Sequence, residues 1–205
     1  MCVIISSMAR KYEMKRRAER MQETRQRIVD ATVELHRSIG PLRTTISAIA
    51  EKAGVERHTY YAHFPELKDL YQACSAHYVV DHPPPDHCSW TEVADHEDRL
   101  RRALSEVYAY YGHHEQIFAN VLRDAEVDAL CAEFTDPVFQ NWKRTWSKAV
   151  TEGWDAEGER GETLMAAIGL ALDFQSWRTL VRGQGLEEDR AVELMAGMVR
   201  CLMRS

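Results

Sequence analysis

Apolar residues recur at three- and four-residue spacing along most of this chain, and no stretch alternates strictly between apolar and polar side chains. The first spacing is that of one face of an α-helix, whereas alternation would indicate a β-strand. The sequence therefore predicts an all-α fold. The expected helices span residues 28–39, 46–53, 56–63, 65–79, 95–112, 115–125, 136–152, 162–180 and 187–203.

Residues 44–71 are the most informative part of the pattern, because they predict two short helices joined by a glycine turn. Thr45 can cap the first helix, and Gly54 can adopt the left-handed conformation that ends it. The second helix, 56–63, is too short and polar to be stable alone, yet its side chains can donate to phosphates and base edges. This arrangement is typical of a helix-turn-helix that reads DNA.

Two strings of residues resemble the DNA-binding domain of the tetracycline-repressor-like (TetR/AcrR) family of bacterial regulators. One is Gly54-Val55-x-x-x-Thr59-x-Tyr61-x-His63-Phe64, followed by Leu70. The other, in the first helix, is Thr24-Arg25-x-x-Ile28-Val29-x-Ala31-x-x-x-Leu35, followed by Gly40. The resemblance covers roughly residues 22–80. It implies an all-helical dimer whose N-terminal three-helix domain holds operator DNA and whose divergent C-terminal helical bundle holds a small-molecule effector.

Three parts of the chain follow from this resemblance: an N-terminal arm over residues 1–21, the helix-turn-helix domain over 22–80, and an effector-binding and dimerisation domain over 81–205. The segment from Arg10 to Arg27 is rich in arginine and lysine. Beside a helix-turn-helix we expect such a segment to contact phosphates or the minor groove, although an ordinary solvated surface is the alternative. Three consecutive prolines predict an extended connector over residues 81–90.

The second helix of the motif supplies the expected contacts to DNA. Arg57 can donate to both acceptors of a guanine, and Thr59, Tyr61 and His63 suit phosphates or a thymine methyl group. Glu56 can accept from a cytosine or simply stabilise the helix start. The full set of expected DNA contacts is Arg25, Thr45, Glu56, Arg57, His58, Thr59, Tyr61, His63 and Lys68.

Other side chains of this helix are expected in the core. Tyr60 and Phe64 fall on its inner face, and for His58 packing and DNA contact are equally consistent with the sequence. Tyr61 and His63 could also merely pack, but the family resemblance places their hydroxyl and imidazole on the DNA side.

One position departs from the family pattern. The family usually has a phosphate-contacting lysine three residues after the Phe64 position, where this chain has Leu67. Lys68 lies one residue later, about 100° further around the helix, and it would reach the backbone only if Pro65, which suits a first helical turn, shifts the helix start. The departure leaves an alternative open, namely a protein-interaction module of the same fold that has lost specific DNA binding.

Charge is distributed unevenly along the chain. Residues 1–71 contain 13 lysines and arginines against 9 aspartates and glutamates, a net charge of +4, and residues 72–205 contain 13 against 23, a net charge of −10. Cations are needed only where phosphates lie, so this division suits a DNA-binding domain on an acidic body. The length of 205 residues and the hydrophobic content of 45% allow both parts to bury a core.

Aromatic side chains gather on the predicted inner faces of the C-terminal helices. Most are expected in an ordinary core, but an apolar pocket with a few polar groups is also how an effector site looks. The candidate pocket residues are Tyr108, Tyr111, His114, Phe118, Trp142, Trp146, Phe174 and Trp177. The adjacent pair His113-His114 is interpreted as a helix end rather than as an acid–base couple.

The last two predicted helices, 162–180 and 187–203, resemble the pair that forms a four-helix dimer interface in the family. The first is apolar nearly all round, which predicts burial of two faces. The core of a monomer is the alternative, although twofold dimers are common among soluble proteins. The candidate interface residues are Leu164, Ile168, Ala171, Met195, Met198 and Leu202.

The connector and its flanks are rich in zinc-ligand residue types. Histidines five residues apart across three prolines match no compact ligand pattern, so a polar loop is preferred and neither a metal nor another cofactor is expected. The residues concerned are His77, Asp81, His82, Asp86, His87 and Cys88.

Several other classes of protein are disfavoured. The five cysteines are scattered and never form a C-x-x-C pair, so we expect a reducing cytoplasm. No apolar run is long enough to span a bilayer, and we expect an unexported protein without a membrane partner. Nucleophile elbows and phosphate loops are absent from the sequence, which argues against an enzyme.

Overall fold

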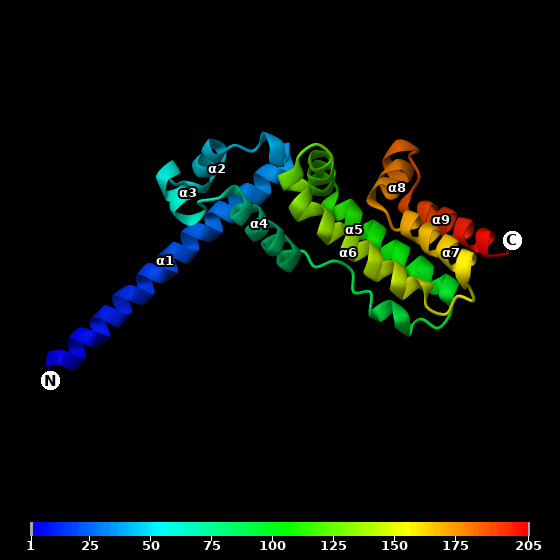
Figure 1. Ribbon diagram of the computed structural model, residues 1–205, viewed down its shortest axis with the longest axis horizontal. Helices are drawn as coiled ribbons and strands as arrows, with labels where there is room; N and C mark the ends of the chain where they lie inside the picture. Colours follow the sequence, from blue (N-terminus) through cyan, green and yellow to red (C-terminus); the bar gives the residue numbers. More distant parts are fainter. Residues whose placement is uncertain (1, 205) are drawn as a thin grey trace. The chain divides into compact units, whose positions relative to one another are not determined.

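The computed structural model describes the backbone of residues 2–204 and the side chains of residues 12–204. All regular structure in these residues is helical, as the apolar spacing predicts, and none of their helices is long and apolar enough to cross a membrane. The helices are α1 (Cys2–Ile39), α2 (Ile46–Ala53), α3 (Arg57–His63), α4 (Leu67–Asp81), α5 (His96–Ala125), α6 (Ala129–Thr151), α7 (Gly158–Ala171), α8 (Phe174–Arg178) and α9 (Glu188–Arg204) (Figure 1). Short turns lie between them: the 3₁₀ turns η1 (Pro41–Arg43) and η2 (Ser89–Glu92), and the π-helical turn η3 (Thr179–Gly183).

The chain divides into two compact units. The first unit combines Met1–Asp81 with Ala119–Phe134, and the second combines His82–Phe118 with Thr135–Ser205. One boundary lies after Asp81, and the end of α5 and the start of α6 group with the first unit. Both elements therefore contribute residues to each unit.

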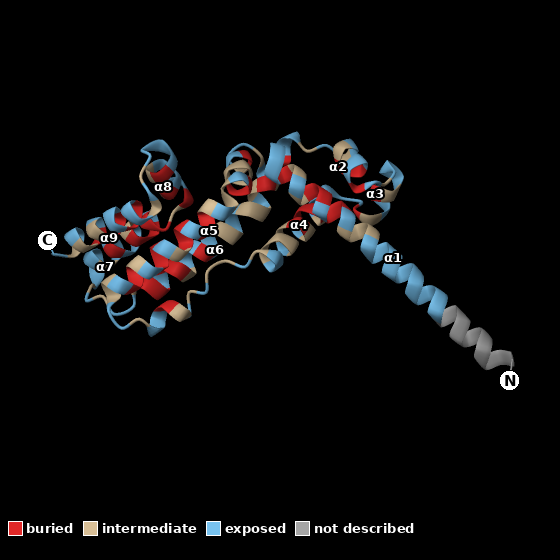
Figure 2. Ribbon diagram, turned by 180° about the vertical axis from the view of Figure 1, so that it is seen from behind, coloured by how far each residue is buried: buried red, intermediate tan, exposed pale blue. Residues whose placement is uncertain are grey.

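The first unit is built around the inner face of α1. Ile28, Ile49, Phe64 and Leu70, from α1, α2, the end of α3 and α4, are almost completely buried against one another (Figure 2). These are the apolar positions that recur at helical spacing, and their burial supplies most of the stability of helices too short to persist alone. The core thus fixes α2 and α3 against α1.

α1 is much longer than the predicted first helix, since it begins at Cys2 and not near residue 28. Residues 12–23 are exposed on every side, and they are mainly alanine, arginine, lysine, glutamate, glutamine and methionine. These residue types favour helix, so the helix extends outward from its packed part without a glycine or proline to end it. The expected arm is therefore continuous with α1, and the side chains of Arg10 and Lys11 lie outside the described residues.

A single helix, α5, replaces the two that were predicted at residues 95–112 and 115–125. Gly112 does not end it, because glycine inside a helix costs only about 1 kcal/mol. A Cβ at this position would lie 2.8 Å from Oε1 of Glu188, so the glycine leaves room for that carboxylate. His113 and His114 consequently lie within the helix and not at its end.

Two more helix boundaries differ from the prediction. α6 begins at Ala129, before Pro137, which lies inside the helix and not in its first turn. The predicted helix over residues 162–180 is instead divided, because α7 ends at Ala171 and Asp173 caps α8 by accepting from the N–H of Gln175 at 2.9 Å. An aspartate that caps a new helix competes with continuation of the old one.

The predicted connector is extended only in part, because its last residues enter turn η2. Trp90 is fully buried there, donates through Nε1 to Glu106 Oε2 at 2.6 Å, and packs against Trp146. The buried guanidinium of Arg99 donates to the carbonyls of Val93 and Glu152. The connector therefore ends in fixed contacts with the second unit.

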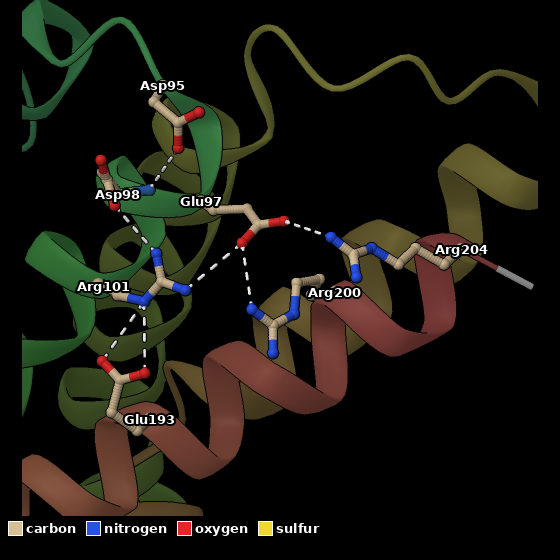
Figure 3. Close-up of polar contacts among 7 residues, drawn as sticks. All are labelled: Asp95, Glu97, Asp98, Arg101, Glu193, Arg200 and Arg204. Carbon is tan, nitrogen blue, oxygen red and sulfur yellow. Dashed lines mark hydrogen bonds and ion pairs between the residues drawn. The ribbon is translucent and has the colours of Figure 1, made fainter.

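A network of ion pairs joins the start of α5 to the last turns of α9. Glu97 lies among Arg101, Arg200 and Arg204, at N···O distances of 3.4, 3.6 and 4.0 Å (Figure 3). Arg101 also contacts Glu193 at 3.3 Å. Isolated surface pairs contribute little, but a network of shared charges fixes helix register more effectively. It places the basic end of α9 against the acidic first turn of α5, as helix dipoles favour.

Candidate nucleic-acid interface

The turn between α2 and α3 has the geometry that its sequence predicts. Oγ1 of Thr45 accepts from the N–H of Ala48 at 3.2 Å and so caps α2. Gly54 ends the helix in the left-handed conformation, with φ 63° and ψ 42°. Such a φ favours glycine because it has no Cβ. The N–H of Val55 returns to the carbonyl of Ala50 at 2.9 Å, which closes the turn and sets the direction in which α3 leaves it.

Arg27 supports the same turn from α1. Its Nη1 donates to the carbonyl of Ala53 at 3.2 Å and lies 3.8 Å from the position that a Cβ on Gly54 would occupy. The guanidinium therefore satisfies a carbonyl at the end of α2, where the helix itself supplies no partner. The sequence does not indicate this role, because an arginine in a basic segment carries no signal of a specific backbone partner.

α3 has one buried and one exposed face. Tyr60 and Phe64 are 1% and 0% exposed and lie in the core, as expected. Arg57, His58 and Tyr61 are exposed, and Tyr61 retains 45% of its surface. These three side chains are therefore accessible from solvent, and the exposure of His58 argues against a role in packing. Thr59 and His63 are half-buried beside them.

Aromatic contacts hold the exposed face in place. The ring of Tyr61 meets the buried ring of Tyr60 edge to face, with centroids 5.3 Å apart. Arg25, from α1, lies half-buried with its guanidinium 4.6 Å from the centre of the Phe64 ring. A cation over an aromatic face is held in orientation while its N–H groups stay available for a phosphate. Both side chains, Tyr61 and Arg25, are therefore held in fixed orientations.

Glu56 and Thr45 occupy the starts of two helices. Glu56 is the N-terminal capping residue of α3, but its carboxylate accepts no capping bond from the first turn. It is exposed, so its acceptor atoms remain free for a base or for water. The hydroxyl of Thr45 uses its oxygen to cap α2 and keeps its proton, which can be donated to a phosphate.

Leu67 and Lys68 both lie in the first turn of α4, because that helix begins at Leu67 and not at Pro65. Leu67 is 42% exposed, an unusual site for an apolar side chain. Nζ of Lys68 pairs with Oε2 of Glu66 at 2.7 Å, and this hydrogen bond raises the pKa of the lysine. A phosphate would have to compete with Glu66 for this cation. The first turn of α4 therefore supplies no unpaired positive charge for DNA, because Leu67 is apolar and Lys68 is paired with Glu66.

The eight candidate pocket residues all lie in the second unit, and seven of them are buried. Tyr111 contacts the rings of Phe118 and Phe174 at 6.2 and 5.3 Å, and Trp142 stacks on Trp146 at 5.7 Å. These aromatic side chains converge, as their positions on the predicted inner faces indicate, and they pack ring against ring.

Polar atoms within this aromatic cluster are mostly satisfied by the backbone. The hydroxyls of Tyr108 and Tyr111 donate to the carbonyls of Ala171 and Leu172 at 2.9 and 2.8 Å, where α7 ends. Burial raises the pKa of both tyrosines. Nε1 of Trp177 is buried without a hydrogen-bond partner, so it is a donor that a ligand acceptor could satisfy.

His114 lies at the edge of the cluster. Its ring is 5.0 Å from that of His82 and 4.5 Å from that of Tyr110. Burial, together with the neighbouring His82 and His113, lowers the pKa of His114 to about 4. The imidazole is therefore neutral near pH 7 and can accept as well as donate a hydrogen bond.

The candidate dimer residues fall into two groups. Leu164, Ile168, Ala171 and Met195 are buried within the second unit itself, so they leave almost no surface for a partner. Met198 and Leu202 are 56% and 40% exposed. The sequence pattern alone could not separate the two groups, because both recur at helical spacing.

Further apolar side chains on α7 and α9 are exposed beside Met198 and Leu202. They are Met165, Leu170 and Leu194. Met165 and Leu170 also line an open groove of about 1070 Å³ between α6 and α7, whose edge carries Lys143, Arg144 and Lys148. Both α7 and α9 therefore carry exposed apolar side chains.

The residues considered as metal ligands do not gather into one site. His77 pairs with Asp30 at 2.9 Å within the first unit, whereas His82 lies against His114 in the second. The donor atoms of Asp86, His87 and Cys88 lie within 4.8 Å of one another. These three are consecutive, and Asp86 already accepts from the N–H of Cys88 at 3.0 Å in a local turn.

Sequence comparison identifies the first unit. Residues 28–74 match the model of the tetR family of bacterial regulatory proteins. The chain is 41% identical over 71 residues to the HTH-type transcriptional regulator TtgR of Pseudomonas putida, covering 34% of each chain. It is 42% identical over 59 residues to the regulator SrpR, also of Pseudomonas putida, covering 29% of this chain and 28% of the relative. The matched segments thus span about a third of these relatives.

Solved structures extend the likeness of fold beyond that segment. A TetR-like transcriptional regulator from Rhodococcus sp. RHA1 superposes with a TM-score of 0.61 at 18% identity, covering 86% of this chain and 93% of the other. The regulator FadR from Bacillus subtilis, in complex with stearoyl-CoA, gives a TM-score of 0.58 at 18% identity, covering 87% and 97%. Residues 28–74 thus match the N-terminal domain of the tetR family of bacterial regulatory proteins, and the fold of most of the chain resembles that of TetR-like regulators.

Proposed function

We propose that this protein is a homodimeric transcriptional regulator that binds a palindromic operator through α3. The exposed face of α3 carries the proposal, because Arg57, His58 and Tyr61 project from a helix that is fixed by its own buried face. The family match over residues 28–74 supports it. The relatives that match this part of the chain are transcriptional regulators, which supports regulation of transcription and not catalysis.

Dimerisation is needed for operator binding because one short helix contacts few base pairs. In a twofold dimer the two α3 helices would enter successive major grooves about 34–36 Å apart. The exposed apolar side chains Leu194, Met198 and Leu202 on α9, with Leu170 on α7, support a second copy of the chain as the partner of this face.

The regulator is proposed to be a repressor that a small, largely apolar effector releases from DNA in a reducing cytoplasm. The aromatic cluster around Tyr111 and Phe118 supports an apolar effector, and FadR from Bacillus subtilis offers a parallel because its structure contains stearoyl-CoA. Nε1 of Trp177 and the neutral imidazole of His114 would provide polar contacts.

Release is proposed to follow from a change in the distance between the two α3 helices of the dimer. The effector needs only to bind the conformation of the released dimer more tightly than the conformation of the DNA-bound dimer. A ligand that binds the protein yet alters neither α3 separation nor operator affinity would contradict this mechanism.

The test is binding of the purified protein to a library of genomic DNA fragments at two salt concentrations, with sequencing of the retained fragments. Enrichment of one palindromic site, weakened by salt, is the expected result, because phosphate contacts release counterions. Retention that is absent or independent of sequence at low salt would contradict specific DNA binding. It would favour a protein-interaction module, an alternative suggested by Leu67 in place of a phosphate-contacting lysine.

A further inference from the structure

The last residues of α5 belong to the first unit, although the helix begins in the second. Three side chains from this segment, Asn120, Arg123 and Asp124, contact the end of α1 and the turn η1. We call these three residues the α5 clasp. They lie more than 40 positions after the family match, which ends at residue 74.

Asn120 binds the C-terminal end of α1. Its Nδ2 donates to the carbonyls of His36 and Arg37 at 3.2 and 2.7 Å. The last four carbonyls of a helix lack partners within it, so an external amide donor stabilises this end. Nη1 of Arg123 donates to Oδ1 of Asn120 at 2.9 Å, which fixes the orientation of the amide.

Asp124 binds the turn that follows. Its side chain is buried, with the residue 2% exposed, and Oδ2 accepts from the N–H of Leu42 at 3.0 Å. Oδ1 accepts from Nε of Arg123 at 2.8 Å. A buried carboxylate is tolerated only when it is paired and hydrogen-bonded. The charge of Asp124 is therefore tied to one arginine and one backbone N–H of η1.

Gly40 shows how closely the clasp approaches the chain. Its φ is 89°, in the region that favours glycine. A Cβ at this position would also lie 2.5 Å from Nη2 of Arg123 and 2.6 Å from Oδ2 of Asp124. Both the positive φ and the close contact with the clasp therefore require a glycine at position 40.

A short, hydrogen-bonded segment links the clasp to α2. Oγ1 of Thr44 donates to the carbonyl of Gly40 at 2.8 Å, and the N–H of Thr44 donates to the carbonyl of Pro41 at 3.0 Å. The next residue, Thr45, caps α2. A shift of Leu42 therefore moves the first turn of α2, which leads through a tight turn into α3.

From these contacts we infer that Asn120 and Asp124 are positioning residues for DNA recognition. They fix the end of α1 and the start of α2, and so determine how α3 is presented to a groove. The inference rests on the proposed function. Asn120 and Asp124 act through the position of α3 and do not themselves contact DNA.

Charge and position predict opposite effects for Asp124. Removing a carboxylate from a DNA-binding unit should strengthen binding to any DNA, because repulsion from phosphates is reduced. Loss of the bond to Leu42 should instead weaken binding to the specific site alone, since base contacts depend on the placement of α3. The ratio of specific to nonspecific affinity separates these two effects.

The experiment measures affinity of the full chain for two DNA duplexes by fluorescence anisotropy. One duplex is the site recovered by the wild-type protein from genomic fragments, and the other is a permuted sequence of the same composition. The variants are Asp124→Ala, Asp124→Asn and Asn120→Ala, with Glu126→Ala as the matched control. Glu126 is an exposed acid in the turn directly after α5, so its loss changes the charge by the same amount. Far-UV circular dichroism verifies that each variant is folded.

We expect Asp124→Ala and Asn120→Ala to reduce the specific-to-nonspecific affinity ratio about tenfold, equivalent to about 1.4 kcal/mol. Asp124→Asn keeps an oxygen acceptor for Leu42 and should lose less. Glu126→Ala should leave the ratio unchanged. A ratio that stays at the wild-type value in folded Asp124→Ala and Asn120→Ala would overturn the inference. Lack of any preference in the wild-type protein would instead overturn the proposed function.

Discussion

His36 provides a test of the first unit through the dependence of its stability on pH. The imidazole is 7% exposed and its ring lies 5.4 Å from that of Tyr71. Burial lowers its pKa from 6.5 to about 4, with a smaller opposing effect from Asp124. The folded protein therefore keeps His36 neutral at pH values where the unfolded chain has already bound a proton.

The sign and size of the effect follow from proton linkage. Because the pKa is depressed on folding, stability is complete above the unfolded pKa of 6.5 and falls as the pH decreases toward 4. Between pH 7.5 and pH 5.0 the expected loss is about 2 kcal/mol of unfolding free energy, since each pKa unit corresponds to about 1.4 kcal/mol. Other groups titrate in the same range, so the effect of His36 must be isolated by substitution.

The assay compares urea unfolding of the wild-type protein and the His36→Phe variant at both pH values, followed by circular dichroism. Phenylalanine keeps an aromatic ring against Tyr71 but cannot bind a proton. The wild-type protein should lose about 2 kcal/mol more than the variant between the two pH values. An equal loss in both proteins would refute the claim that His36 is buried in its neutral form.

Three further predictions concern single side chains. The buried hydroxyl of Tyr60 has no hydrogen-bond partner, so Tyr60→Phe should raise the unfolding free energy by about 1 kcal/mol. Tyr108→Phe loses a bond to a buried carbonyl and should lower the unfolding free energy by about as much. Urea unfolding measures both variants, and a Tyr60→Phe protein less stable than Tyr108→Phe would contradict the prediction. Leu67→Lys should strengthen DNA binding and steepen its salt dependence by about one phosphate contact, and an unchanged slope of log affinity against log salt would exclude that contact. Met198→Arg should convert dimers to monomers in light scattering, whereas Val80→Arg, at an exposed apolar site of the first unit, should not; a dimeric Met198→Arg protein would place the interface elsewhere.

The helix-turn-helix was predictable from sequence because its determinants are local. Thr45 and Gly54 act within one helix, and the burial of Tyr60 and Phe64 follows from the spacing of apolar positions. A family resemblance over the same residues added the expectation of DNA contact. The exposure of Tyr61 then follows from its position about 100° around the helix from the buried Tyr60.

The remaining features depend on contacts between residues far apart in the chain. No local signal assigns Asn120 to the carbonyls of α1. No local signal shows that α5 continues through Gly112, and the end of α7 depends on the capping side chain of Asp173. Likewise, the burial of Leu164 and the exposure of Met198 are decided by which face of each helix meets its neighbour.

The most direct test of the central claim is a base-pair substitution scan of the recovered operator with the wild-type protein and the Arg57→Ala variant. If α3 reads bases, the wild-type protein should lose about 1–3 kcal/mol of binding free energy for each substitution at a contacted pair. The variant should bind the operator more weakly and should no longer discriminate at one pair in each half-site, while it keeps discrimination elsewhere. An identical substitution profile for both proteins would contradict sequence reading by α3.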